Sequence, residues 1–153
     1  MTGGNQLARV AYPSPSSTAA TSVMRANRKV DTRPEVRLRQ ELHRLGLRFR
    51  KHLPIEAQGF VVRPDVVFTS HRLAVFVDGC FWHCCPVHGT KPRSNSAYWT
   101  AKLERNRARD AQVDERLASG GWLVMRIWEH VPAAHAAADI HKALREDSFE
   151  IRN

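Results

Sequence analysis

The sequence predicts a single-domain α/β sandwich, in which helices cover a central mixed sheet of about four or five short strands. Three observations support this fold class. The chain has 153 residues, enough for one domain with a core but too few for two. Helical and strand-like patterns follow one another in the order helix, several strands, helix, strand, helix. The strand-like runs are nearly continuous in apolar residues, as expected for a sheet covered on both faces.

Residues 1–22 are predicted to form a flexible leader, and residues 23–153 the single domain. The leader is rich in Pro, Ser, Ala and Thr and has no apolar core of the signal-peptide kind. A helix is then predicted to begin at Asp31 or Thr32, because a proline falls in its first turn and Gly46 suits its end. Its polar face is mostly arginine.

Strand patterns occupy the middle of the chain. The stretch LRFRKHLPI, residues 47–55, alternates apolar and polar residues as a strand does. After a turn at Gly59, a Val- and Phe-rich segment predicts a hairpin with strands at about 65–69 and 73–77. The run WLVMRIWEH, residues 122–130, predicts one more buried strand.

Two further helices are predicted in the second half of the chain. Ser96 suits the N-cap of a long polar helix, and Gly120 suits its end. Pro132 is expected to open the last helix.

Basic residues are concentrated in one part of the chain. The net charge is +9, and between Arg25 and His52 ten Lys or Arg residues stand against three acids. Clustered positive charge favours a polyanion, because each neutralised phosphate releases condensed counterions. A surface that serves only solubility is the alternative, although such surfaces usually mix both signs. We therefore expect a nucleic-acid partner, no membrane partner and a soluble, cytoplasmic protein, since no apolar run is long enough to span a bilayer.

All three cysteines lie in one loop, FVDGCFWHCCPVHGT, residues 76–90. Cys80, Cys85 and His88 place three thiolate or imidazole ligands within nine residues, a donor set that zinc prefers. Three cysteines so close together cannot build a disulfide framework, which favours a reducing compartment. Packed thiols beside a surface histidine are the alternative reading.

A closed structural zinc site needs a fourth ligand from elsewhere in the chain. His130 is the best candidate, because it directly follows an apolar strand whose end would hold it rigidly. His71 and Cys84 remain alternatives.

Two acids flank the predicted hairpin. Asp65 begins one strand and Asp78 ends the next, so antiparallel pairing would bring both carboxylates to one edge of the sheet. Carboxylates there would suit Mg²⁺, which can activate water and stabilise a phosphodiester transition state. Glu35 could orient a water, and His83 could act as a general acid or base. Ordinary turn residues and a loop histidine are the alternative.

Aromatic residues surround the same loop. Phe81 and Trp82 follow the first cysteine, and Trp99 opens the long helix. Rigid apolar side chains on a basic surface can enter a base stack, with Lys102 and Asn106 close enough to reach base edges. A small hydrophobic cluster that closes the metal loop is the alternative.

Five segments between residues 22 and 131 resemble the very short patch repair (Vsr) endonucleases: MRANRKVDTRPEVRLR, RPDVVF, FVDGCFWHCCPVHGTKPRSN, YWTAKLERNRARD and GWLVMRIWEH. The resemblance implies a restriction-endonuclease-like fold of three layers with a structural Zn²⁺. It also implies Mg²⁺-dependent nicking of double-stranded DNA on the 5′ side of the T in a T:G mismatch.

The resemblance also implies roles for individual residues. Asp65 corresponds to the principal Mg²⁺ ligand and Val77 to a residue whose carbonyl binds the same ion. Asp78 would bind the metal or orient the phosphate, Glu35 would hold a water, and His83 would be the catalytic histidine. The implied DNA contacts and zinc ligands are Met24, Phe81, Trp82, Trp99, Lys102 and Asn106, and Cys80, Cys85, His88 and His130.

Two positions depart from the expected patterns. His130 stands where the family usually has cysteine, which still suits zinc. Cys80 stands where restriction-type nucleases usually have lysine, and the resemblance implies that His83 supplies the chemistry instead. The resulting hypothesis is a monomeric mismatch-nicking enzyme, which other repair proteins could join. The alternatives are a non-catalytic zinc-stabilised DNA-binding module and a restriction-like nuclease without mismatch preference.

Overall fold

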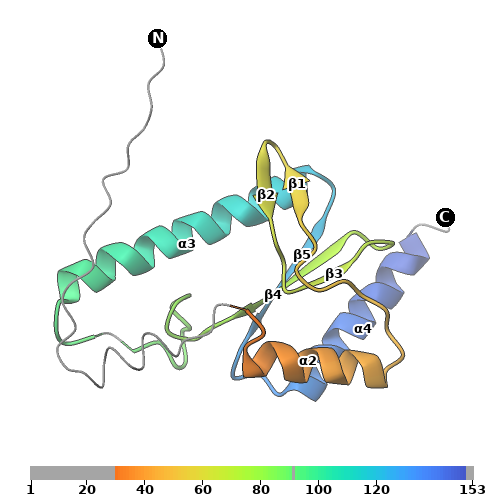
Figure 1. Cartoon of the computed structure of the whole chain (residues 1–153), viewed down its shortest axis with the longest axis horizontal. Helices are drawn as coiled ribbons and strands as arrows, with labels where there is room; N and C mark the ends of the chain where they lie inside the picture. Colours follow the sequence, from red (N-terminus) through yellow and green to blue (C-terminus); the bar gives the residue numbers. More distant parts are fainter. Residues whose placement is uncertain (1–29, 91, 151–153) are drawn as a thin grey trace, which may run out of the picture.

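The computed structural model describes residues 30–90 and 92–150, so the predicted leader and Met24 lie outside the described residues. The described chain contains three helices and five strands (Figure 1). In chain order these are α2 (Arg33–Arg44), β1 (Ile55–Ala57), β2 (Phe60–Val62), β3 (Val66–Phe68), β4 (Leu73–Asp78), α3 (Ser96–Ser119), β5 (Leu123–Trp128) and α4 (Ala133–Glu150). None of the described helices is long and apolar enough to cross a membrane.

The central sheet is mixed, as the sequence predicts. Its strand order is β3-β4-β5, in which β3 runs antiparallel to β4 and β5 runs parallel to it. The described part of this sheet has three strands, fewer than expected. β1 and β2 form a separate antiparallel hairpin, closed by Gln58 and Gly59. Both of these residues have positive φ, 49° and 77°, which is typical of the tight turns that join two short strands.

The stretch 47–55 is not the strand that its alternating pattern predicts. Within residues 47–54, Arg50 alone pairs with another strand, through an isolated bridge to Val67. His52 then turns the chain with φ of 50°, which an extended strand does not allow. The alternation has another cause, because Leu47 and Phe49 pack against the core from a loop.

Helices cover both faces of the sheet, which gives three layers (Figure 1). On one face, α2 and α4 pack against β3 and β4 through Leu38, Leu42, Val66, Phe68, Leu73, Val75, Ala136, Ala137, Ile140 and Leu144. On the other face, α3 and the β1–β2 hairpin pack through Ile55, Ala57, Val62, Val67, Ala74 and Leu117. The alternate residues of each central strand therefore face opposite layers, as near-continuous apolar strands predict.

The helix ends follow the predicted signals with one difference. Thr32 is the N-cap of α2, and Gly46 adopts φ of 72° just beyond its end. α3 begins at Ser96 itself, and the preceding Asn95 is the N-cap, with φ of 53°. Asparagine tolerates this left-handed conformation, which explains the one-residue shift from the predicted cap at Ser96. Leu117, near the C-terminal end, is the buried residue of α3, and the first half of the helix extends beyond the sheet beside the loop that follows β4 (Figure 1).

Candidate functional site

Three acids, Glu35, Asp65 and Asp78, converge at one end of the sheet, and we call them the acid centre. Asp65 directly precedes β3, and its Oδ2 accepts a hydrogen bond of 2.7 Å from the N–H of Val77. Asp78 is the last residue of β4. Pairing of β3 with β4 thus brings Asp65 and Asp78 to the same end of the sheet, as the predicted hairpin requires.

Glu35 enters the acid centre from the first turn of α2. Its side chain is buried, and its carboxylate accepts hydrogen bonds of 2.9 Å from the N–H of Asp31 and from the hydroxyl of Thr32. Arg39 and His52 approach the same carboxylate at 3.7 and 3.9 Å. These contacts fix the position of Glu35, which an acid that orients a water would need.

The electrostatics of Asp65 suit a divalent cation. The pKa of Asp65 is raised to about 6, mainly by burial and also by the nearby charges of Glu35 and Asp78, against the lowering effects of the Val77 N–H and of His52. Because the N–H and C=O of one strand residue point toward the same neighbour, the Val77 carbonyl also faces the Asp65 side. Carboxylate and carbonyl oxygens are the ligands that Mg²⁺ prefers, so this donor set fits the predicted metal.

Asp78 is also a predicted metal ligand, and the structure gives it a second set of partners. Both of its oxygens accept hydrogen bonds from Nη1 of Arg126, at 3.0 and 3.1 Å. Burial raises the pKa of Asp78, although the charges of His83 and Arg126 oppose the increase. Its role as a Mg²⁺ ligand stays a prediction.

His83 is oriented by an aspartate that the sequence does not single out. Its Nδ1 lies 2.5 Å from Oδ2 of Asp110, on α3, and 3.7 Å from Oδ1 of Asp78. A carboxylate at Nδ1 favours the tautomer in which that nitrogen carries the proton. Nε2 is then the nitrogen that can exchange a proton with a substrate, as a general acid or base requires.

Sequence reasoning also misses Arg126, in the middle of β5. Its Nε lies 3.0 Å from both carboxylate oxygens of Asp114, and its Nη2 donates to the carbonyl of Asp110 at 3.4 Å. A signal for this contact exists in the sequence, because a single arginine inside the apolar run WLVMRIW requires an anionic partner when it is buried. The spacing of Asp110 and Asp114, one helical turn apart, is consistent with such a partner.

The predicted zinc ligands form a second cluster, which we call the Cys/His cluster: Cys80, Cys85, His88 and His130. One ligand atom from each lies within 4.8 Å of the others, and Nδ1 of His130 is 3.1 Å from Sγ of Cys80. Burial, with the neighbouring Cys85 thiol, raises the pKa of Cys80 to about 11. Without a cation the Cys80 thiol would therefore stay protonated, whereas a bound cation would stabilise two adjacent thiolates, and this donor set fits Zn²⁺.

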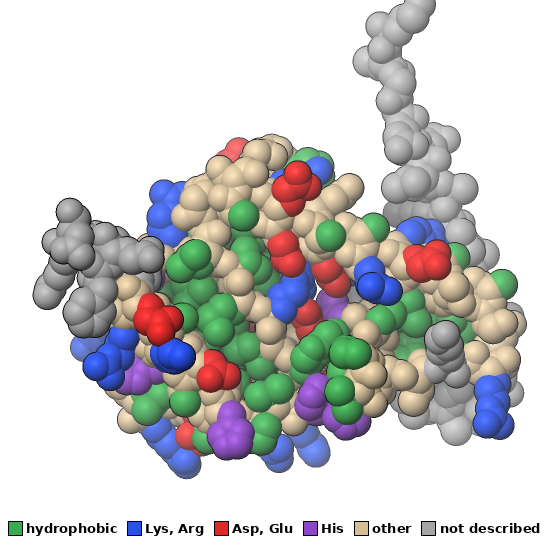
Figure 2. Space-filling view, turned by 180° about the vertical axis from the view of Figure 1, so that it is seen from behind, with side chains coloured by type: hydrophobic (Ala, Val, Ile, Leu, Met, Phe, Trp, Pro, Cys, Tyr) green, Lys and Arg blue, Asp and Glu red, His purple; other side chains and the backbone are tan. Residues whose placement is uncertain are grey.

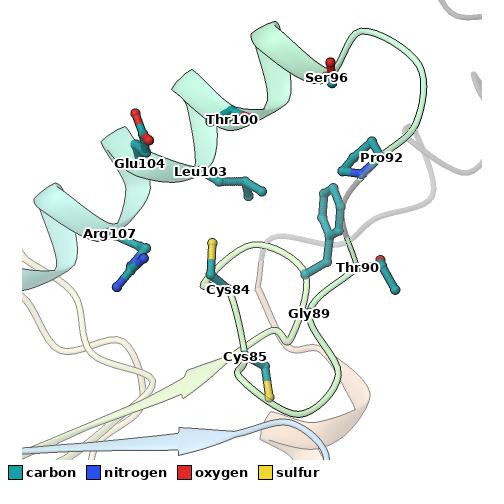
Figure 3. Close-up of a pocket in the computed structure, with 11 residues that line it drawn as sticks. Cys84, Cys85, Gly89, Thr90, Pro92, Ser96, Thr100, Leu103, Glu104 and Arg107 are labelled. Atoms are coloured by element: carbon teal, nitrogen blue, oxygen red, sulfur yellow. The ribbon is translucent and has the colours of Figure 1, made fainter.

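The two alternative fourth ligands lie elsewhere. His71 is in the β3–β4 turn, where its Nδ1 lies 3.0 Å from the hydroxyl of Ser70. Cys84 points toward Leu103 of α3, whereas Cys85 points in the opposite direction (Figure 3). Cys84 thus lines a cavity of about 400 Å³ between α3 and the loop.

The predicted wedge residues lie together. Ring centroids of Phe81 and Trp82 are 5.0 Å apart, and both rings contact Trp99, at 5.4 and 6.0 Å. Nζ of Lys102 lies 5.3 Å from the centroid of Trp82 and 5.4 Å from that of Trp99. Asn106 donates to the carbonyl of Trp82 at 3.2 Å. The DNA roles of these residues stay predictions, because a cluster that closes the loop has the same contacts.

The arginine-rich face of α2 is exposed, and so is the chain that follows it. The exposed arginines are Arg33, Arg37 and Arg44 on α2, and Arg48 and Arg50 in the chain after it. Elsewhere the surface is less uniform, and the face in Figure 2 carries basic, acidic and histidine side chains interspersed with hydrophobic ones. The basic surface is therefore local, as the uneven charge of the sequence predicts.

Comparisons with known proteins assign the chain to a family. The family model for the DNA mismatch endonuclease Vsr matches residues 16–88. The type II nicking enzyme V.NaeI of Lentzea aerocolonigenes is 45% identical over 130 residues, which are 84% of this chain and 78% of that protein. The nicking enzyme V.XorIIP of Xanthomonas oryzae is 43% identical over 109 residues, 70% of this chain and 76% of that protein.

The DNA mismatch endonuclease Vsr of Escherichia coli K12 is 36% identical over 107 residues, which are 69% of this chain and 66% of that protein. The match to the family model includes the segments that carry the acid centre and all three cysteines of the loop. The chain therefore belongs to the Vsr family of DNA mismatch endonucleases and is a DNA endonuclease.

Proposed function

We propose that this endonuclease nicks double-stranded DNA at T:G mismatches, on the 5′ side of the T, and that the reaction depends on Mg²⁺. One observation carries the proposal: the loop after β4 joins the acid centre to the aromatic cluster, and the same loop carries His83. Asp78 precedes this loop directly, and Phe81 and Trp82 come three and four residues later. The names of the relatives, nicking enzymes and a mismatch endonuclease, support the same reaction.

Asp65 and the carbonyl of Val77 would hold the Mg²⁺ ion. Bound there, the ion would supply positive charge that stabilises the phosphodiester transition state and activates water. Glu35, fixed by Thr32 and the N–H of Asp31, would orient the attacking water.

His83 would move the proton in this reaction. Its Nδ1 is held by Asp110, so its Nε2 would exchange a proton with the attacking water or with the leaving oxygen. Asp110 would stabilise the protonated ring while the proton is in transit. We assign Asp110 as the positioning residue for His83.

Recognition would come from the aromatic cluster of Phe81, Trp82 and Trp99. Opening a base step costs a few kcal/mol, and this cost is lowest where the bases are mispaired. The aromatic rings would exchange their contacts with one another for contacts with bases, while Lys102 and Asn106 reach base edges. The Cys/His cluster, with Zn²⁺ bound, would keep the loop rigid enough for this exchange. One copy of the chain suffices for such an asymmetric site.

The test uses two duplexes of the same sequence, one with a T:G mismatch and one fully paired. Each is incubated with and without Mg²⁺, and strand-specific labels report nicking of either strand. We expect nicking of the T-containing strand in the mismatched duplex with Mg²⁺, and little in the other three samples. Equal cutting of the paired duplex would show a restriction-like nuclease without mismatch preference. Equal nicking without Mg²⁺ would remove the metal from the proposal.

A further inference from the structure

Arg126 lies at the centre of a charged network between the sheet and α3. It pairs with Phe76 across the β4–β5 ladder, so both side chains point to the α3 face, and so does Asp78 two residues further along β4. The guanidinium carbon of Arg126 lies 4.6 Å from the centroid of the Phe76 ring. The arginine is thus packed against an apolar surface while its nitrogens contact carboxylates.

One guanidinium connects three acids from two elements. Nη1 bonds both oxygens of Asp78 on β4, Nε bonds both oxygens of Asp114 on α3, and Nη2 lies 3.8 Å from Oδ1 of Asp110 and donates to its carbonyl. The side chain of Arg126 is 22% exposed, and that of Asp78 is 7% exposed. A planar fork with several donors suits such a site, whereas a lysine ammonium could not span it in the same way.

His83 lies against two of the same acids. Its Nδ1 is 2.5 Å from Asp110 and 3.7 Å from Asp78, so two carboxylates compete for one ring nitrogen. Arg126 decides between them, because it occupies both oxygens of Asp78 and leaves Oδ2 of Asp110 for the histidine. The same contact holds the Asp78 carboxylate on the α3 side of the sheet.

We propose that Arg126 is a positioning residue for the nicking reaction: its guanidinium restrains Asp78, so that Asp110 alone orients His83 and Asp78 is kept from binding Mg²⁺. The proposal rests on the proposed function, because it assumes that His83 moves the proton. It goes beyond that function because it assigns the charge of Asp78 to the Arg126 guanidinium and not to a metal ion.

The kinetic experiment compares Arg126→Met, Arg126→Lys and the double variant Arg126→Met with Asp78→Asn. In Arg126→Met, kcat for nicking of the T:G duplex should fall by about 10–100-fold, while KM for DNA stays nearly unchanged. Loss of residues that orient active-site groups typically has an effect of this size. The double variant should regain much of this loss, because the freed carboxylate is gone. Arg126→Lys should lie between wild type and Arg126→Met. Arg72→Met serves as the control, since it removes an arginine that stacks on Trp122 outside this network.

Each outcome decides the proposal. A kcat for Arg126→Met within about twofold of wild type would overturn it, as would a double variant no faster than the single one. The single variant leaves a buried carboxylate unpaired; if it does not fold, the double variant and Arg126→Lys still give the comparison. A marked rise in the half-saturating Mg²⁺ concentration in Asp78→Asn alone would assign Asp78 to the metal and would also overturn the proposal.

A second readout does not depend on nicking. Imidazole ¹⁵N shifts of His83, recorded in the DNA-free protein at one pH near 8, report which ring nitrogen carries the proton. We expect the Nδ1-protonated tautomer in wild type and in Arg72→Met, and a changed tautomer population in Arg126→Met. Unchanged shifts in Arg126→Met would refute the coupling of Arg126 to His83. If wild type fails to nick T:G duplexes, the proposed function is lost, and these shifts still decide whether Arg126 orients His83.

Discussion

The acid centre and the Cys/His cluster adjoin in the chain, since Cys80 is two residues after Asp78, but they balance their charges differently. Acids of the centre have cationic partners from the protein, because Arg126 contacts Asp78 and Arg39 contacts Glu35. In the Cys/His cluster, by contrast, Cys80 lies beside a further acid, because the carboxylate of Glu129 accepts a hydrogen bond from the N–H of Cys80. We therefore expect the acid centre to fold without Mg²⁺ and the Cys/His cluster to depend on the proposed Zn²⁺.

The largest expected effect comes from the Cys/His cluster. Cys80→Ser should lose most of a zinc content of about one ion per chain and lower the Tm by roughly 10 °C or more, because ion binding contributes directly to folding. Cys84→Ser is the matched control, since that thiol faces α3, and it should keep the zinc. Metal analysis with thermal unfolding measures both. Equal zinc in Cys80→Ser and wild type would contradict the assignment of the cluster.

The aromatic cluster depends on the same loop but should affect recognition alone. Trp82→Ala should reduce nicking of the T:G duplex by about 10–100-fold, since stacking on a base contributes about 1–3 kcal/mol. Its zinc content should remain that of wild type. Phe60→Ala, an exposed aromatic on the β1–β2 hairpin, is the control. Single-turnover nicking of mismatched and paired duplexes gives the measurement, and an unimpaired Trp82→Ala variant would exclude Trp82 from the wedge.

Substitution of Asp65 should stabilise the protein, in contrast to substitution of Cys80. The ionised carboxylate of Asp65 destabilises the folded protein when Mg²⁺ is absent. Its pKa is raised from 3.8 to about 6, so its contribution to stability falls as the pH rises from about 4 to 6 and is then constant. Asp65→Asn retains an acceptor for the N–H of Val77 and does not ionise. We expect it to be more stable than wild type by about 1–3 kcal/mol above pH 7, and equally stable below about pH 4.

Urea unfolding at these two pH values, without Mg²⁺, measures the difference between Asp65→Asn and wild type. Wild type should not be more stable than Asp65→Asn at either pH. If Asp65→Asn unfolds at a lower urea concentration than wild type above pH 7, the ionised Asp65 carboxylate does not destabilise the folded protein as proposed.

The smallest expected effect concerns the anchor of Glu35. Thr32 forms no side-chain cap to α2, but its hydroxyl donates to Glu35. Thr32→Val removes this hydrogen bond with little change in shape and should cost about 1 kcal/mol of stability and a few-fold in nicking. Thr69→Val, in the exposed β3–β4 turn, should change neither. A Thr32→Val variant with full stability and activity would show that Glu35 is held by its other contacts.

The parts of the site that depend on strand pairing could be predicted from sequence. Hairpin pairing places Asp65 beside Val77, because the register follows from two apolar runs and the turn between them. The spacing of Cys80, Cys85 and His88 within one loop similarly limits where their ligand atoms can lie. These are local relations, which periodicity and ligand spacing describe.

The remaining parts depend on how distant elements pack. Asp110 contacts His83 only because α3 packs beside the end of β4. No local sequence pattern predicts where a distant helix packs on the sheet. The alternation of residues 47–55 predicts a strand where the chain is a loop, because Leu47 and Phe49 reach the core without strand pairing. The arginine within β5 was the available signal for a buried acidic partner, although it could not identify Asp78 or Asp114.

The most direct test of the account separates chemistry from recognition in Asp65→Asn. Nicking of the T:G duplex under single-turnover conditions with Mg²⁺ is measured beside affinity for the same duplex. We expect nicking to fall by roughly a thousandfold or more, because the principal metal ligand is lost, while Kd changes by no more than about threefold. A nicking rate within about tenfold of wild type, whether or not Kd changes, would contradict the central claim that Asp65 holds the catalytic metal.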